Sequence, residues 1–136
     1  MTDIRPELSP KNKYWLEKHR YYELKHFCLQ YPYWKRTVKE IDGMDSKNFP
    51  RGIFGGNFSN PTLKAVELRE EYSNKMILLQ DVIMTASPEL SDYIFKAVTL
   101  ELSYENLRLI HGLPCGREMW YDIYRRFFYI LSDSRK

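Results

Sequence analysis

Fold class is best predicted from residues 103–132, SYENLRLIHGLPCGREMWYDIYRRFFYILS, near the C-terminal end of the chain. Ser103 can cap a short helix over residues 104–111, because its side chain can accept a hydrogen bond from a free backbone N–H group. Gly112 follows where the end of a helix favours a left-handed residue. Residues 113–116, LPCG, then predict a tight connection to a longer helix that runs from Arg117 to about Ser132.

Apolar residues recur along this last helix at helical spacing and predict its core face: Met119, Ile123, Phe127 and Ile130. In the short helix, Leu107 and Ile110 are expected to pack against Leu113 and that face. Another helix, from Pro88 to about Glu101, precedes them. The order of a helix, a short helix and a longer helix is typical of a trihelical helix-turn-helix unit, here over residues 88–132.

The rest of the chain also reads as helical, without any clear strand alternation. Residues 13–41 predict an aromatic and basic helical hairpin that Pro32 interrupts. Residues 42–60 hold four of the six glycines and predict a loop, which Phe49, Ile53, Phe54 and Phe58 could order. Asn60-Pro61 then starts a long central helix over residues 61–86. Its predicted apolar stripe consists of Leu63, Val66, Leu68, Met76, Leu79, Val82 and Ile83. We therefore expect an all-α fold.

Length and composition bound the class of protein. A chain of 136 residues, 43% hydrophobic and 29% charged, predicts one domain covering residues 1–136. Cys28 and Cys115 have no paired spacing, and the polar N-terminal residues lack the apolar core of an export signal, so we expect a reduced, cytoplasmic protein. No apolar run is long enough to predict a membrane span.

Charge is segregated along the chain, although the net charge is only +3. Residues 1–41 carry nine basic and five acidic side chains, and residues 102–136 carry six and four. Residues 61–101 between them carry four basic and seven acidic side chains. Two basic ends permit contact with nucleic acid, but solvated helix faces also produce such a pattern.

The stretch Ala97-Val-Thr-Leu-Glu-Leu-Ser-Tyr-Glu-Asn-Leu-Arg-Leu-Ile-His-Gly112-Leu resembles the helix-turn-helix with which bacterial sigma factors read the promoter minus-35 element. The C-terminal two thirds, above all residues 113–131, resembles small proteins of temperate phages and integrated elements in Firmicutes. These are similar in layout to phage late-gene activators of the ArpU and RinA type. The resemblance implies a DNA-binding transcriptional regulator of phage or mobile-element origin, whose partner is double-stranded DNA.

In such a module the last helix enters the major groove with its N-terminal, solvent-facing side chains. The resemblance therefore implies base or phosphate contacts by Arg117, Tyr121 and Arg125, flanked by Trp120 and Tyr124. Glu118 and Asp122 depart from this pattern, since carboxylates are repelled by phosphates. The structural alternative is an amphipathic helix whose charges pair along its own face, as Asp122 could with Arg125 or Arg126.

Basic residues outside that helix are further candidates for phosphate or partner contacts: Lys18, Arg20, Lys25 and Arg126. Each has a structural alternative. The aromatics between the N-terminal cations are at core spacing, and Arg126 could pair with an acidic residue of the central helix. The aromatic segment would also suit a protein interface, in a homodimer or with RNA polymerase.

Catalytic patterns are lacking, so we expect neither enzyme activity nor a cofactor. His111 and Cys115 are four residues apart, but Gly112 and Pro114 intervene, and a shared metal site is not expected. The rival to the DNA-binding hypothesis is a protein-interaction module that retains the helix-turn-helix only as a scaffold and binds a host or phage protein.

Overall fold

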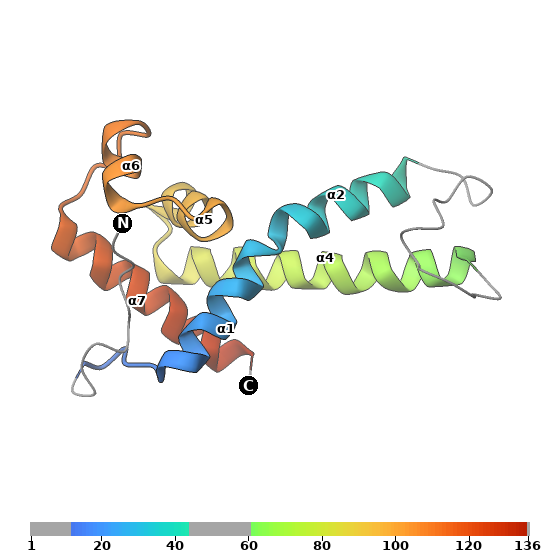
Figure 1. Ribbon diagram of the computed structural model, residues 1–136, viewed down its shortest axis with the longest axis horizontal. Coiled ribbons are helices and arrows are strands. Elements are labelled where there is room, and N and C mark those ends of the chain that lie inside the picture. Colours follow the sequence, from blue (N-terminus) through green and yellow to red (C-terminus); the bar gives the residue numbers. More distant parts are fainter. Residues whose placement is uncertain (1–11, 44–60, 136) are drawn as a thin grey trace. The chain divides into compact units, whose positions relative to one another are not determined.

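The computed structural model describes residues 12–43 and 61–135, and this part of the chain is all-helical, which confirms the predicted all-α class (Figure 1). Within these ranges, none of the helices combines the length and the apolar character needed to cross a membrane. Most of the predicted loop 42–60, including its four apolar residues, lies outside the described residues. The helices are α1 (Lys18–Leu29), α2 (Tyr31–Asp42), α4 (Pro61–Ala86), α5 (Ser91–Leu100), α6 (Tyr104–Leu109) and α7 (Arg117–Ser134).

The chain divides into two compact units. Unit 1 comprises Met1–Gln30 and Leu79–Lys136, and unit 2 comprises Tyr31–Leu78. The two helices of the predicted hairpin over residues 13–41 therefore belong to different units, and the central helix α4 contributes to both. The prediction of a single domain stays a prediction.

Local signals explain most helix boundaries near the N-terminus. The α1 helix starts at Lys18, later than expected, because the Glu17 carboxylate caps it by accepting from the backbone N–H groups of His19 at 2.9 Å and Arg20 at 3.2 Å. It ends at Leu29. Pro32 then lies in the first turn of α2, where its missing N–H group costs nothing. The predicted break between the two helices is confirmed.

In unit 1, α1 packs against α5 and α7 around an aromatic core. The ring of Phe128 lies 5.0 Å from that of Tyr21 and 5.0 Å from that of Tyr124. The predicted core face of α7 is confirmed at Phe127, which is buried, and is wrong at Met119, which is 56% exposed. The α7 residues that are buried are Trp120, Phe127, Phe128 and Leu131.

The segment from α5 to α7 has the predicted order of helices. Ser103 caps α6 by accepting from the backbone N–H group of Asn106 at 3.1 Å, and Gly112 has a φ of 73°, so both predictions are confirmed. α5 starts at Ser91 rather than Pro88, because Ser87 Oγ instead holds a preceding turn through the N–H group of Leu90 at 3.3 Å. Leu107 and Leu113 are buried as expected, whereas Ile110 is 70% exposed.

In unit 2, α2 and the first part of α4 meet through aromatic side chains. Trp34 is buried, and its ring lies 6.4 Å from that of Tyr72 of α4. An exposed ion pair between Arg69 of α4 and Asp42 of α2 joins the same two helices. Leu63 and Val66, which the sequence predicted in the core stripe of the central helix, are more than half exposed.

Candidate nucleic-acid interface

The sequence-predicted residues Arg117, Tyr121 and Arg125 lie one turn apart along the N-terminal half of α7. Together with Glu118 and Asp122 they line an open surface hollow of about 390 Å³. In this first half of α7 the buried residue is Trp120, which lies at another position around the helix, and the other buried residues of α7 follow further along. The structure thus brings the three predicted contact residues together on one accessible surface, which we call the α7 face.

Arg117 is held by neighbouring side chains at the start of this face. Its guanidinium donates to the Tyr121 hydroxyl at 2.9 Å and forms an ion pair with Glu105 in the first turn of α6. The Tyr104 ring lies below it, with its centre 4.9 Å from the guanidinium carbon. The hydrogen bond from Arg117 lowers the pKa of Glu105, and the same bond raises the pKa of Arg117. Arg117 is therefore positioned by α6 before any ligand binds.

The α7 face carries two cations and two carboxylates. Neither Arg125 nor Arg126 forms an ion pair with another residue in the described ranges, so the predicted alternative of pairing with Asp122 is absent there. Arg126 is exposed, and Arg125 is half-buried. Both guanidinium groups can accept an anionic partner without first losing an internal ion pair within this part of the chain.

Two of the predicted flanking aromatics belong to the core. Trp120 is only 2% exposed, so direct contact with DNA is excluded in this conformation. Tyr124 is half-buried, and its hydroxyl lies 3.3 Å from that of Tyr21 on α1. Both residues fix α7 on the rest of unit 1 and thereby support the α7 face from behind.

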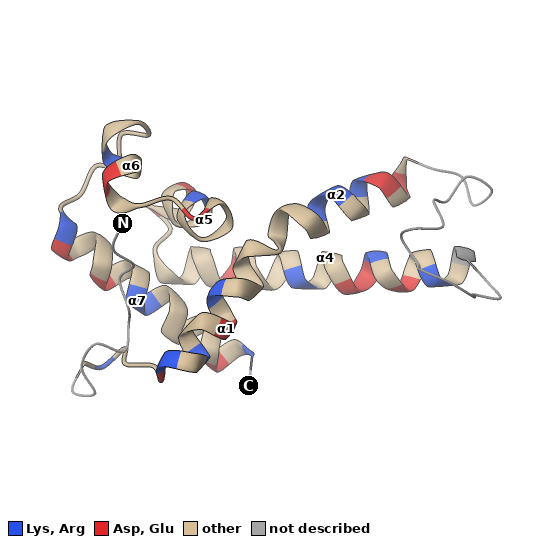
Figure 2. Cartoon of the chain, viewed as in Figure 1, with Lys and Arg blue, Asp and Glu red and all other residues tan. Residues whose placement is uncertain are grey.

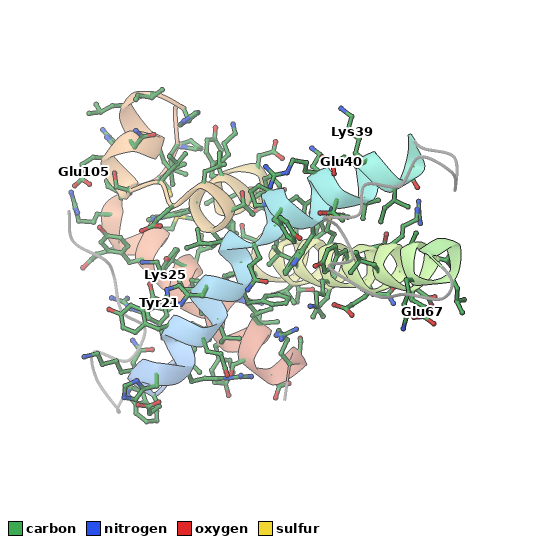
Figure 3. All side chains as sticks on the ribbon, turned by 45° about the vertical axis from the view of Figure 1, so that its right-hand side comes forward. Tyr21, Lys25, Lys39, Glu40, Glu67 and Glu105 are labelled. Carbon is green, nitrogen blue, oxygen red and sulfur yellow. The ribbon has the colours of Figure 1, made fainter. Side chains whose placement is uncertain are left out.

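The basic residues of α1 differ in whether their side chains are available to an external partner. Arg20 donates to backbone and side-chain oxygens at the end of α7. The side chain of Lys25, a residue labelled in Figure 3, is 13% exposed and lies 3.7 Å from a carboxylate oxygen of Glu101. Lys18 is exposed at the start of the helix. Arg20 and Lys25 thus have internal partners, which the spacing of residues in the sequence did not reveal.

Glu105 is the residue of this site that sequence reasoning missed. It lies twelve residues before Arg117 and reaches it only because α6 and α7 fold together. A carboxylate in the first turn of a helix is expected from the helix dipole alone, and this local explanation conceals its contact with Arg117.

In the described ranges, no three His, Cys, Asp or Glu side chains gather as metal ligands would. Burial raises the pKa of the Cys28 thiol far above its usual range and raises that of Cys115 to a smaller degree. A thiol with a raised pKa is a weak nucleophile at neutral pH.

Comparison of the chain with protein-family models, with curated proteins and with solved structures found no match. The resemblance to sigma-like and phage regulators accordingly stays a prediction, and the case for the α7 face depends on its own geometry.

Proposed function

We propose that this protein is a DNA-binding transcriptional regulator of phage or mobile-element origin that contacts duplex DNA through the α7 face. The observation that carries the proposal is that Arg117, Tyr121 and Arg125 line one open surface hollow. This hollow lies at the start of a helix that follows a short helix and a tight turn. A helix so placed can present its first turns to the major groove.

Arg117 would contact DNA by exchanging one hydrogen-bond acceptor for another. Its present partner Glu105 is an exposed carboxylate, and exposed ion pairs contribute little to stability, so a phosphate or the O6 and N7 atoms of guanine can replace it at small cost. The aromatic rings of Tyr104 and Tyr121 beside the guanidinium keep its plane fixed during this exchange. Arg125, one turn further along α7 from Tyr121, would supply a second cation.

The carboxylates of Glu118 and Asp122 give this face a selective character. They repel phosphates, which weakens binding to DNA of arbitrary sequence, and each can accept a hydrogen bond from the amino group of cytosine. We therefore expect the α7 face to contribute to sequence discrimination more than to total affinity.

The test is fluorescence anisotropy of labelled duplexes, comparing a random sequence with a pool from the genomic neighbourhood of the gene, at low and moderate salt. Arg117→Ala combined with Arg125→Ala should weaken binding to the preferred duplex at least tenfold, since each good bidentate base contact contributes about 1–3 kcal/mol. Lys13→Ala with Lys64→Ala removes the same charge elsewhere and is the matched control. Unchanged affinity in the first variant would overturn the proposal.

A second candidate function is a protein-interaction module, for which a host or phage protein such as RNA polymerase would be the partner. It is favoured by three exposed apolar side chains at the end of α6 and the start of α7: Leu109 (81% exposed), Ile110 (70%) and Met119 (56%). An interface built on these residues would resist added salt, whereas DNA binding through several phosphates weakens steeply. Salt dependence therefore separates the two candidates.

A further inference from the structure

The solvent side of α2 in unit 2 carries three basic residues, Lys35, Arg36 and Lys39, and all three are exposed. With 3.6 residues per turn, they lie on the side of the helix opposite Trp34 and Ile41, which α2 buries. Figure 2 shows blue for Lys and Arg along α2, followed by red for Asp and Glu at its C-terminal end, and in Figure 3 Lys39 extends away from α4. We call this surface the α2 basic face.

These cations differ from the other described basic residues of unit 2 in forming no ion pair within the described ranges. The α4 cations of the same unit are paired: Lys64 with Glu67 at 3.6 Å, Lys75 with Glu71 at 3.2 Å, and Arg69 with Asp42. The described cations of α4 in this unit thus each have an ion-pair partner, and the three cations of the α2 basic face have none within the described ranges.

The arrangement on α2 places like charges side by side, and the carboxylate of Glu40, four residues after Arg36, lies at the edge of the same face without an ion pair in the described ranges. Lys35 and Lys39 are four residues apart, and Arg36 and Lys39 are three apart, which places like charges next to each other. The helix dipole favours only Lys39, which lies in the last turn. Arg36 lies against the exposed ring of Tyr33, with 5.7 Å between the guanidinium carbon and the ring centre, and is held at the surface. An anionic partner with several charges would relieve the repulsion.

We propose that the α2 basic face binds the phosphate backbone of duplex DNA. The inference rests on the proposed function, because it takes the DNA contacted by the α7 face as the ligand of a second surface on the other unit. Contacts of Lys and Arg with phosphates supply affinity without sequence information. The α2 basic face would therefore provide the salt-dependent binding that the α7 face, with equal numbers of cations and carboxylates, does not.

The experiment measures the binding constant for a random duplex as a function of salt concentration. The test variant is Lys35→Gln, Arg36→Gln and Lys39→Gln, and the matched control is Lys64→Gln, Arg69→Gln and Lys75→Gln, which removes three paired cations from the same unit. Circular dichroism establishes that both variants are folded. Each phosphate contact contributes about 0.9 to the slope of log binding constant against log salt, so the slope of the test variant should fall by about 2 to 3.

The proposal is supported if the salt slope falls in the test variant and stays near the wild-type value in the control. Equal slopes in wild type and test variant overturn it, while the proposed function stands if Arg117→Ala with Arg125→Ala still abolishes preference for one duplex. Conversely, if the salt slope falls in the α2 variant while Arg117→Ala with Arg125→Ala leaves duplex binding unchanged, phosphate binding by the α2 basic face is supported. The same result overturns the proposed function of the α7 face. If the α2 variant binds duplex normally but no longer binds phosphatidylserine–phosphatidylcholine vesicles, the surface is a membrane contact and the proposal is overturned.

Discussion

Arg20 of α1 binds Ser132 in the last turn of α7 through two donors. Its Nε donates to the Ser132 hydroxyl at 3.0 Å, and its Nη2 donates to the Ser132 carbonyl oxygen at 2.9 Å. The same nitrogen also reaches the carbonyl oxygen of Arg135 at 3.0 Å. Because the last carbonyl groups of a helix lack partners within it, this guanidinium satisfies the C-terminal end of α7 and ties it to α1.

Arg20→Ala should lower the free energy of unfolding by about 1–2 kcal/mol, since hydrogen bonds from a charged donor to α7 are lost. Urea unfolding followed by circular dichroism measures this. Arg20→Lys should recover only part of the loss, because an ammonium group cannot reproduce the planar geometry. The salt dependence of duplex binding should not change in either variant. A stable Arg20→Ala protein with a reduced salt slope would instead assign Arg20 to phosphate contact.

Glu105→Gln should raise the affinity for duplex DNA about two- to fivefold, the opposite of what most substitutions near a binding site do. The substitution removes the anion that competes with DNA for Arg117 and removes one negative charge beside the α7 face. Fluorescence anisotropy of a labelled duplex at low salt measures this change in affinity. In the background of Arg117→Ala, Glu105→Gln should have much less effect, because the competition no longer exists. An equal gain in both backgrounds would show that only the net charge matters.

Asp42→Asn should destabilise the folded protein near neutral pH and have no effect in acid. The hydrogen bond from Arg69 lowers the pKa of Asp42, so the carboxylate binds protons less readily in the folded chain than in the unfolded one. Its contribution to stability is therefore present above the ordinary pKa of Asp and is lost as pH falls through the lowered pKa. Urea unfolding at neutral pH and near pH 2 measures the difference.

Glu40→Gln is the matched control for this prediction, because Glu40 lies two residues earlier on α2, is also exposed and has no ion pair with another residue of the described part. It should change stability little at either pH. If the cost of Asp42→Asn were the same in acid as at neutral pH, the contribution of Asp42 would not be its charge.

Signals that lie within a few neighbouring residues could be predicted from the sequence. The cap at Ser103, the left-handed Gly112 and the break before Pro32 each depend on the chemistry of one residue and its neighbours. Glu101, at the end of α5, also has a positive φ, of 57°, but its residue type does not favour that conformation and predicts nothing.

The buried face of α7 and the contacts between α7 and other helices could not be predicted in the same way. Large apolar residues occur nearly all round this helix, so that periodicity alone allowed a face with Met119 as well as the observed face with Trp120. The partners of Arg20 at the end of α7 lie 112 and 115 residues away in sequence. Such contacts depend on how helices pack, and this information is absent from local spacing.

Two glycines near the start of α7 should respond to substitution in opposite directions. Gly112 has a φ of 73°, and a Cβ atom placed there would meet no atom within 4 Å. Gly112→Ala should therefore cost about 1–2 kcal/mol, from the left-handed backbone alone. Gly116 has an extended backbone and occupies the N-cap of α7 without a side-chain hydrogen bond, also with open space around it. Gly116→Ser should add a capping hydroxyl and stabilise the fold by a few tenths of a kcal/mol.

Urea unfolding of the two single variants tests both signs, and Gly112→Asn separates conformation from volume. Asparagine tolerates the left-handed region better than alanine, although it is larger, so Gly112→Asn should cost less than Gly112→Ala. The opposite order would mean that the volume of the side chain at residue 112, and not its backbone conformation, sets the cost. The turn between α6 and α7 would then have less free space around it than the structure shows. An effect of Gly112→Ala on duplex binding beyond its effect on folding would show that this turn also sets the position of the α7 face.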